Sequence, residues 1–377
     1  MSTNKAAFIY SDKLSQHILS PSHPMQPKRL AMTYDLLKQY DAFNQNNTQV
    51  ISPRNVTRNE LIKFHTTDYI DAIENISNNP NTISAALYNL GTADNPSYPQ
   101  MFEAALLSTG GSALAADLLI SSKYDSVFNI SGGLHHAMRA NASGFCVFND
   151  PVIAIEKFTE QKMKVVYIDI DCHHGDGVQK AYYDRDDVLT ISIHESGAFL
   201  FPGTGNTNEI GTGRGAGYSI NVPLYPYTDD EIYKDIFKKI VPPLIEFFQP
   251  DVLVTQMGID SHFEDPLTHL SLTVQGFTEI LKIFKSFNLK WLSLGGGGYN
   301  LQAVARAWAS GWGVISNQTL PNDIPVNYYQ THNISSLFDL SPPKITDDVK
   351  NVCKNFVDKN ISTLEKELKS IHSIHFG

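Results

Sequence analysis

The sequence is poor in cysteine. It contains three cysteines in 377 residues, and these lie far apart and are odd in number. Such spacing provides neither a disulfide framework nor a zinc-finger arrangement, which favours a reducing compartment, so we expect a cytoplasmic protein. The three residues are Cys146, Cys172 and Cys353.

The sequence also lacks an excess of basic charge. It has 29 lysines and arginines against 39 aspartates and glutamates, which gives a formal net charge of −10. Proteins that bind nucleic acids usually carry the opposite bias, so we expect no nucleic-acid partner. An acidic surface suits a basic partner better.

Long apolar segments are missing as well. Residues 1–10 have no extended apolar core, and Asp12 and Lys13 follow at once, so we expect no signal peptide. We find no stretch that is apolar over the roughly 20 residues that a membrane helix needs, and we expect no membrane partner. The composition, 42% hydrophobic and 18% charged, is that of a globular chain with a large core.

The sequence does contain a regular alternation of strand-like and helix-like segments. We predict strands at residues 6–10, 126–130, 164–170, 188–193, 218–222, 252–256 and 291–294. We predict helices at 27–40, 68–76, 99–120, 149–160, 175–183, 229–248, 272–287, 301–314 and about 345–371. A capping box at 57–60 predicts the start of one more helix. Residues 41–54, 78–99 and the stretch after 316 look irregular. This order predicts an α/β fold with a mostly parallel sheet and helices on both faces.

No internal repeat or linker divides the chain. We therefore predict one domain over residues 1–377, with a catalytic core at about 6–314 and a C-terminal extension. The last predicted helix is amphipathic, with Thr346 as its cap. Its apolar side is predicted to carry Val349, Val352, Phe356 and Leu364.

The chain centres on residues 165–177, V-V-Y-I-D-I-D-C-H-H-G-D-G. This stretch begins with β-branched and aromatic residues, typical of a buried parallel strand, and ends in aspartates, histidines and glycines. Asp171 and His173 are two residues apart, so on an extended backbone their side chains leave the same face. A carboxylate and an imidazole together suit a zinc-type metal. The alternative is a polar turn in which the two side chains only bind each other.

Chemically unusual residues follow five of the predicted strands. These clusters are S-G-G-L-H-H at 131–136, the polar end of the central stretch at 171–176, His194 and Glu195 with the glycine-rich F-P-G-T-G loop, M-G-I-D-S-H-F around Asp260, and G-G-G-G-Y-N at 295–300. The carboxyl ends of parallel strands share one edge of a sheet, and ligands bind there. We therefore expect the five clusters to form one catalytic site.

Three of these residues are suited to hold one metal ion. Asp171, His173 and Asp260 would supply one nitrogen and two carboxylate oxygens, the ligand set of a catalytic zinc that keeps an open position. Such a metal polarises a carbonyl group and activates a bound water. The alternative for Asp260 is a helix cap or a loop aspartate.

Two adjacent histidines and a tyrosine could complete the chemistry. His135 and His136 each need a partner to fix the tautomer, and Asp169 and Asp176 are available, which predicts two His–Asp pairs for acid–base catalysis. The alternatives are that one histidine binds the metal or that both are structural. Tyr299 follows four glycines, and its hydroxyl could donate to a developing oxyanion, although such a tyrosine more often serves packing.

The motifs G-G-L-H-H, D-I-D-C-H-H-G-D-G, F-P-G-T-G and G-G-G-G-Y-N occur in this order between about residues 6 and 313. Together they resemble the zinc-dependent histone deacetylases of class I type, and the bacterial acetoin utilization proteins most of all. The resemblance implies the arginase–deacetylase fold, with a central parallel sheet of about eight strands. It also implies hydrolysis of N-ε-acetyl-lysine, in a protein or peptide substrate, to lysine and acetate.

The resemblance implies roles for single residues. The three predicted ligands would bind zinc, with ferrous iron as an alternative native metal. His136 would act as general base and then acid, His135 would support it electrostatically, and Tyr299 would polarise the acetyl carbonyl. Asp94 on its own looks like a turn aspartate, but it resembles the rim aspartate that holds the substrate backbone. Gly144, Phe145 and Phe201 would form the walls of the tunnel for the lysine stem, Leu267 would lie at the rim, and Gly297 would also bind substrate. Arg29 would line an inner acetate-release channel.

Potassium is a further cofactor that the resemblance implies, largely through main-chain oxygens. An inner site would use Asp169, Asp171, His173, Ser192 and Ile193. An outer site would use Tyr182, Arg185, Val188 and Tyr218. After Gly313 the chain matches no long tail of the nuclear enzymes and has no basic cluster that would serve as a nuclear address, so we expect no chromatin role.

Three other functions are open alternatives. An arginase-like ureohydrolase with two manganese ions would need more ligands than the Asp260 loop offers. A deacetylase of polyamines or other small amides would keep the same site, but Leu267 places no carboxylate at the rim to select a second ammonium group. A non-catalytic binder of acetyl-lysine would not need the intact His135, His136 and Tyr299. The sequence predicts no oligomeric state.

Overall fold

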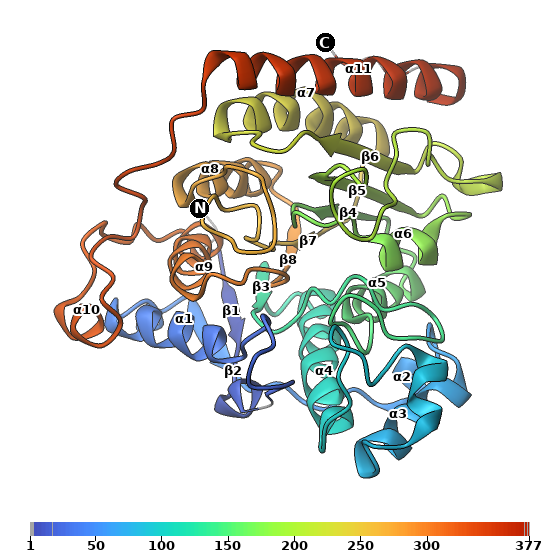
Figure 1. Ribbon diagram of the computed structural model, residues 1–377, viewed down its shortest axis with the longest axis vertical. Helices are drawn as coiled ribbons and strands as arrows, with labels where there is room; N and C mark the ends of the chain where they lie inside the picture. Colours follow the sequence, from blue (N-terminus) through green and yellow to red (C-terminus); the bar gives the residue numbers. More distant parts are fainter. Residues whose placement is uncertain (1–3, 17, 373, 375, 377) are drawn as a thin grey trace.

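The computed structural model describes residues 4–16, 18–372, 374 and 376. Figure 1 shows a central sheet with helices on both sides. The sheet has eight strands in the order β2-β1-β3-β8-β7-β4-β5-β6, and every pairing is parallel. The strands are β1 (Ala6–Ile9), β2 (Thr48–Ile51), β3 (Ser126–Asn129), β4 (Val165–Asp169), β5 (Val188–Glu195), β6 (Ser219–Leu224), β7 (Val252–Gln256) and β8 (Lys290–Leu294). The predicted fold class is therefore confirmed.

Two hydrophobic cores lie on the two faces of this sheet. Successive residues of a strand point to opposite faces, and β1 accordingly places Phe8 in one core and Ile9 in the other. The first core contains residues of α1, α7, α8, α9, α10 and α11, and the second contains residues of α2, α3, α4, α5 and α6. The helices are α1 (Lys28–Gln39), α2 (Arg58–Leu61), α3 (Thr67–Asn78), α4 (Met101–Ile120), α5 (Asp150–Glu160), α6 (Asp176–Tyr182), α7 (Asp230–Phe248), α8 (Val274–Ser286), α9 (Leu301–Ser316), α10 (Val326–His332) and α11 (Asp347–His372).

Several elements differ from the sequence prediction. β2 lies in residues 41–54, which we predicted as a loop. A short, half-buried edge strand that follows several asparagines carries little apolar pattern. The 3-10 helix η2 (Ile83–Tyr88) and α10 also lie in stretches predicted as irregular. β5 runs on to Glu195, so His194 and Glu195 belong to the strand and do not follow it. The capping box of Thr57 and Glu60 at the start of α2 is confirmed.

Helix α4 corrects the prediction about membranes. By length and composition it is apolar enough to cross a membrane, with a mean hydropathy of 1.2, so the statement that no stretch has this character was wrong. Half of the helix window is buried inside the protein, and the core helix of a globular protein passes the same test. Its Ser112 hydroxyl donates to the buried Asp150 carboxylate at the start of α5.

Helix α11 is the predicted C-terminal helix, and it lies along α7 and β6 (Figure 1). Leu364 is fully buried as predicted, but the side chain of Val352 lies on the outside, where the residue is 46% exposed. The buried face consists of Cys353, Val357, Ile361, Leu364 and Leu368. The prediction that the whole chain is one domain stays a prediction.

Candidate active site

Four of the five predicted clusters directly follow a strand of the sheet. In chain order, β3, β4, β7 and β8 are followed by the clusters at 131–136, 171–176, 257–265 and 295–300. These four strands are neighbours in the middle of the sheet, in the order β3-β8-β7-β4, so their carboxyl ends bring the clusters together (Figure 1). The fifth cluster, after β5, adds the loop that contains Phe201. The expected convergence at one edge of the sheet is therefore present.

Asp171, His173 and Asp260 form a compact, buried triad. Their candidate ligand atoms lie within 4.8 Å of one another. The Nδ1 atom of His173 is 3.1 Å from Asp171 Oδ1 and 2.9 Å from Asp260 Oδ2. One nitrogen and two carboxylate oxygens that point at each other in a buried place are a donor set that fits a divalent cation.

The electrostatics of the triad also fit a bound cation. Burial raises the pKa of the Asp260 carboxyl, and the charge of Asp171 raises it further, to about 7. Burial also disfavours a charged ring at His173, but the two carboxylates outweigh it and raise its pKa well above the usual value. The triad therefore favours a positive charge at its centre, and a bound metal ion would supply that charge.

The carboxylates of the triad are held by neighbouring groups. Asp171 Oδ2 accepts hydrogen bonds from Gln256 Nε2 at 2.6 Å and from the main-chain nitrogen of Gly297 at 2.8 Å. Asp260 Oδ1 accepts one from the main-chain nitrogen of Cys172 at 2.7 Å. A Cβ atom at Gly297 would lie 2.2 Å from Asp260 Oδ2, so only glycine fits there.

Both predicted His–Asp pairs are formed beside the triad. The Nδ1 atoms of His135 and His136 lie 2.7 Å from Asp169 Oδ2 and Asp176 Oδ1, respectively. The Nε2 atoms of the two histidines are 3.0 Å apart. Neither histidine is among the ligand atoms that converge in the triad, which argues against the alternative that one of them binds the metal.

Tyr299 lies at the same site. Its main-chain nitrogen donates to Asp265 Oδ2 at 2.8 Å, and its ring meets that of Phe145 edge to face at 5.7 Å. Burial, and then the charges of Asp260 and Asp171, raise the pKa of its hydroxyl well above the usual value. The hydroxyl therefore stays protonated and can act as a hydrogen-bond donor.

Comparisons with known proteins agree with this arrangement. Residues 23–315 match the family model described as "Histone deacetylase domain". The chain is 37% identical to the acetoin utilization protein AcuC of Bacillus subtilis over 98% of both chains. It is 38% identical to histone deacetylase 1 of Homo sapiens over 92% of this chain and 72% of that protein.

The chain belongs to the histone deacetylase family. A solved structure of a histone deacetylase homologue from Aquifex aeolicus superposes with a TM-score of 0.86 at 29% identity, covering 97% of this chain and all of that one. This likeness supports the arginase–deacetylase fold that the motifs implied. The membership makes the chain a hydrolase of the deacetylase type, in which the buried triad is the candidate metal site.

Several of the predicted substrate residues of this histone deacetylase family member lie beside the His–Asp pairs and the triad. Phe201 is 46% exposed, and its ring lies 5.1 Å from that of His136. Gly144 and Phe145 both have positive φ angles, and a Cβ atom at Gly144 would lie 2.3 Å from His136 Cδ2. Half-buried Leu267 donates its main-chain N–H to Asp265. Gly297 contacts the triad itself, although we predicted it as a substrate-binding residue.

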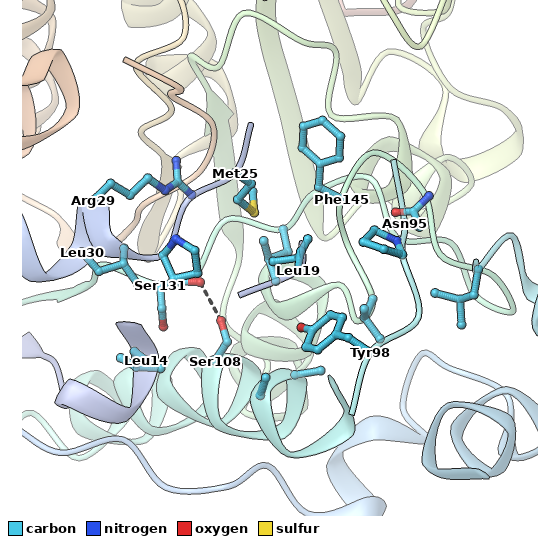
Figure 2. A pocket seen from close by; sticks show the side chains of 17 residues that line it. Leu14, Leu19, Met25, Arg29, Leu30, Asn95, Tyr98, Ser108, Ser131 and Phe145 are labelled. Carbon is cyan, nitrogen blue, oxygen red and sulfur yellow. Dashed lines mark hydrogen bonds between the residues drawn. The ribbon is translucent and has the colours of Figure 1, made fainter. Parts of the chain in front are cut away.

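Arg29 lies against a cavity that Phe145 also lines. Its buried guanidinium donates to the Gly298 carbonyl at 2.8 Å and lies 5.1 Å from the Trp308 ring centroid. The cavity has a volume of about 110 Å³ and a mainly apolar lining (Figure 2). Its lining includes Leu14, Leu19, Met25, Leu30, Tyr98, Leu134 and Val147. A buried cation beside a small cavity is compatible with the predicted acetate channel.

The residues of the predicted potassium sites are partly brought together. Asp169 in β4 pairs with Ser192 in β5, which places two members of the inner set side by side. Two members of the outer set lie near the start of β5, because Val188 opens that strand and the Tyr218 carbonyl accepts a hydrogen bond from Thr190. Both potassium sites stay predictions.

Sequence reasoning missed three residues that hold the site. Gln256 binds Asp171, the Tyr167 hydroxyl donates to Asp169 at 2.6 Å, and Asp265 binds the main chain of Tyr299. Of the three, Gln256 could most readily have been predicted from the sequence, because it is a polar residue at the end of a buried strand next to a catalytic cluster.

Proposed function

We propose that the protein is a metal-dependent deacetylase that removes the acetyl group from N-ε-acetyl-lysine in a protein or peptide. The observation that carries this proposal is the convergence of one three-residue metal triad, two His–Asp pairs and Tyr299 at one end of the sheet. Family membership supports the deacetylase reaction, since relatives carry that name. The acetyl-lysine substrate and the residue roles are our inference.

The chain's own residues divide the work. His136 would take a proton from the attacking water and later give it to the leaving amine. His135 would carry a positive charge beside it, and the Tyr299 hydroxyl would donate to the oxygen that becomes negative. A cation held by the triad, zinc or ferrous iron, would polarise the carbonyl and acidify the water.

Substrate binding follows from the surroundings. The rings of Phe145 and Phe201 would contact the four methylenes of the lysine stem, which are apolar. Asp94, on an exposed turn, would hold the backbone of the peptide, and Leu267 would contact the rim. Arg29 would receive the acetate product in its cavity. The three cysteines are free, which agrees with the cytoplasmic location that we propose.

The test is metal removal and reloading. We expect the chelated protein to lose activity on an acetyl-lysine peptide and to regain it with one equivalent of Zn²⁺ or Fe²⁺. Asp260→Asn should bind little metal, whereas Asp186→Asn, a surface carboxylate paired with Arg214, should bind it normally. Two stoichiometric transition metals by elemental analysis would contradict the single site.

A substrate comparison tests the finer proposal. We expect kcat/KM to be at least about tenfold higher for an acetylated peptide than for an acetylated polyamine, because Leu267 itself places no carboxylate at that rim position to bind another ammonium group; the ratio corresponds to ~1.4 kcal/mol. A preference for the polyamine would replace the proposed substrate class while leaving the deacetylase chemistry in place.

A further inference from the structure

The turn that carries Asp94 is held mainly by itself. The main-chain N–H groups of Gly91 and Thr92 donate to the Asn95 carbonyl, and the Asn95 N–H donates to the Thr92 hydroxyl. Asp94 is exposed. Among the residues that the structure describes, one hydrogen bond joins residues 91–95 to a distant part of the chain, and its donor is His23.

His23 is buried, with 3% of its surface exposed, and its tautomer follows from its partners. Its Nδ1 atom lies 3.0 Å from the main-chain nitrogen of Met25, which can only donate, so Nδ1 is the acceptor. The ring proton of neutral His23 therefore lies on Nε2, which is 3.2 Å from the carbonyl oxygen of Asp94 and donates to it. His23 thus tethers the turn.

The ring of His23 has a second contact. Its centroid lies 4.5 Å from that of Phe145, with the rings at 75°. Phe145 in turn meets Tyr299 at 5.7 Å and 85°. Phe145 and Asn95, the residue after Asp94, also line the cavity in Figure 2 together with Met25. One buried ring therefore joins the turn of Asp94 to the ring that packs on Tyr299.

We propose that His23 is a positioning residue for substrate binding, which acts through Asp94 by its Nε2–H and through Phe145 by its ring. The inference rests on the proposed function, because it matters only where Asp94 binds a peptide backbone. Within the part of the chain that the structure describes, the turn of Asp94 has no other distant hydrogen bond, so losing this tether lets the carboxylate move away from its substrate. The lysine stem and the acetyl group do not use that tether.

Two variants separate the two contacts. His23→Phe keeps a ring against Phe145 but removes the donor to Asp94, and His23→Gln keeps a donor at the reach of Nε2 but removes the ring. We expect His23→Phe to raise KM for an acetyl-lysine peptide about tenfold, the effect of one lost hydrogen bond, with kcat changed by less than about threefold. We expect His23→Gln to restore most of the peptide KM and instead to lower kcat a few-fold, because Phe145 packs less well on Tyr299.

A substrate without a backbone provides the specific readout. N-butylacetamide has the acetylated stem but no peptide groups, so its kcat/KM should be the same in His23→Phe as in the natural protein. A double-mutant cycle tests the route: if His23 acts through Asp94, the peptide KM of the double variant His23→Phe/Asp94→Ala should equal that of Asp94→Ala alone. Thermal melts of all variants establish that they fold.

The outcomes that would overturn the inference are distinct from those that would overturn the function. Additive effects of His23→Phe and Asp94→Ala, or equal losses on the peptide and on N-butylacetamide, would reduce His23 to a structural role. A His23→Gln variant no better than His23→Phe in peptide KM would remove the tether. An unmodified protein that does not hydrolyse the peptide at all would instead refute the proposed function.

Discussion

The two His–Asp pairs of the active site share one chemistry but differ in the surroundings of the carboxylate. In the buried pair, His135 and Asp169, the side chain of Asp169 has 0% exposure. Besides the histidine, Asp169 accepts hydrogen bonds from the Tyr167 hydroxyl at 2.6 Å and from the main-chain nitrogen of Asp171 at 3.1 Å. The Asp169 carboxylate is therefore buried and accepts hydrogen bonds from donors within the protein.

The outer pair, His136 and Asp176, is less enclosed. The Asp176 side chain is 11% exposed and, among the described residues, accepts from the histidine and from the main-chain N–H of Gly177 at 2.9 Å. Asp176 also borders a surface pocket together with Lys180 and Glu209. Solvent can therefore share in stabilising this carboxylate, whereas the charge of Asp169 must be balanced inside the protein.

The two histidines of these pairs also differ in pKa. Burial disfavours a charged His135, but Asp169 and Asp171 outweigh it and raise its pKa to about 9. Burial lowers the pKa of His136, and the charge of His135 lowers it further, to about 4, despite the opposing Asp176. These shifts favour a charged His135 and a neutral His136 at neutral pH, which supports their proposed roles.

The largest expected effect comes from removing the neutral base. We expect His136→Ala to lower kcat on the order of 10³-fold or more, because it removes general base and acid together. The matched variant His135→Ala should cost less, on the order of 10- to 100-fold, because it removes only a neighbouring charge. Steady-state kinetics with metal analysis checks both. Loss of the metal in His136→Ala would mean that this ring is a ligand, and equal losses would erase the distinction between the pairs.

The carboxylates offer a second matched comparison. Asp176→Asn can donate to His136 Nδ1 and so favour the wrong tautomer, which we expect to lower kcat by several hundredfold. Asp169→Asn removes the charge that keeps His135 cationic, and we expect a loss of about 10- to 100-fold. Steady-state kinetics of both variants, after a thermal melt shows that they are folded, measures the two losses in kcat. A larger loss at Asp169 than at Asp176 would assign the base to the buried pair.

Tyr299 belongs to neither pair, and we expect its removal to lower kcat less than the loss of the base. A phenol that donates to the oxyanion stabilises the transition state more than the ground state, so Tyr299→Phe should lower kcat on the order of a hundredfold. Peptide KM should change much less, because the walls at Phe145 and Phe201 remain. The ring is kept, so a thermal melt should show a folded protein. Near-normal kcat would mean that another group binds the oxyanion.

Much of this site could be predicted from local sequence patterns. Asp171 and His173 follow a buried strand at the spacing that puts them on one face, and His135 and His136 follow another strand. Parallel pairing places the strand ends on one edge of the sheet, and the neighbouring positions of β3, β8, β7 and β4 bring the clusters close together. The shared edge could be predicted without the strand order, whereas the short distances between the clusters depend on that order.

The remaining parts depend on register and burial, which local patterns do not contain. Gln256 reaches Asp171 because β7 pairs with β4 so that Gln256 lies opposite Asp169. The different pKa values of His135 and His136 depend on the burial of both rings and on the charges around them, which tertiary packing determines. The edge strand β2 has too few apolar residues to be distinguished from a loop.

The smallest effect should come from the hydroxyl that encloses the buried pair. Tyr167→Phe keeps the ring in the core but removes one donor to Asp169, so the carboxylate must rely more on His135. We expect kcat to fall only about threefold, since His135 stays charged and His136 is untouched. Peptide KM and metal content should stay unchanged, and steady-state kinetics with metal analysis measures all three.

Tyr182→Phe is the matched control for this last change. Its hydroxyl is equally buried and donates to the main-chain carbonyl of Val152 at 3.2 Å, away from both pairs. The two variants should lose similar thermal stability, because each leaves one buried acceptor short of a donor. Only Tyr167→Phe should lower kcat. If both variants lowered kcat alike, the effect would come from general loosening of the core, and the enclosure of Asp169 would have no specific part in keeping His135 charged.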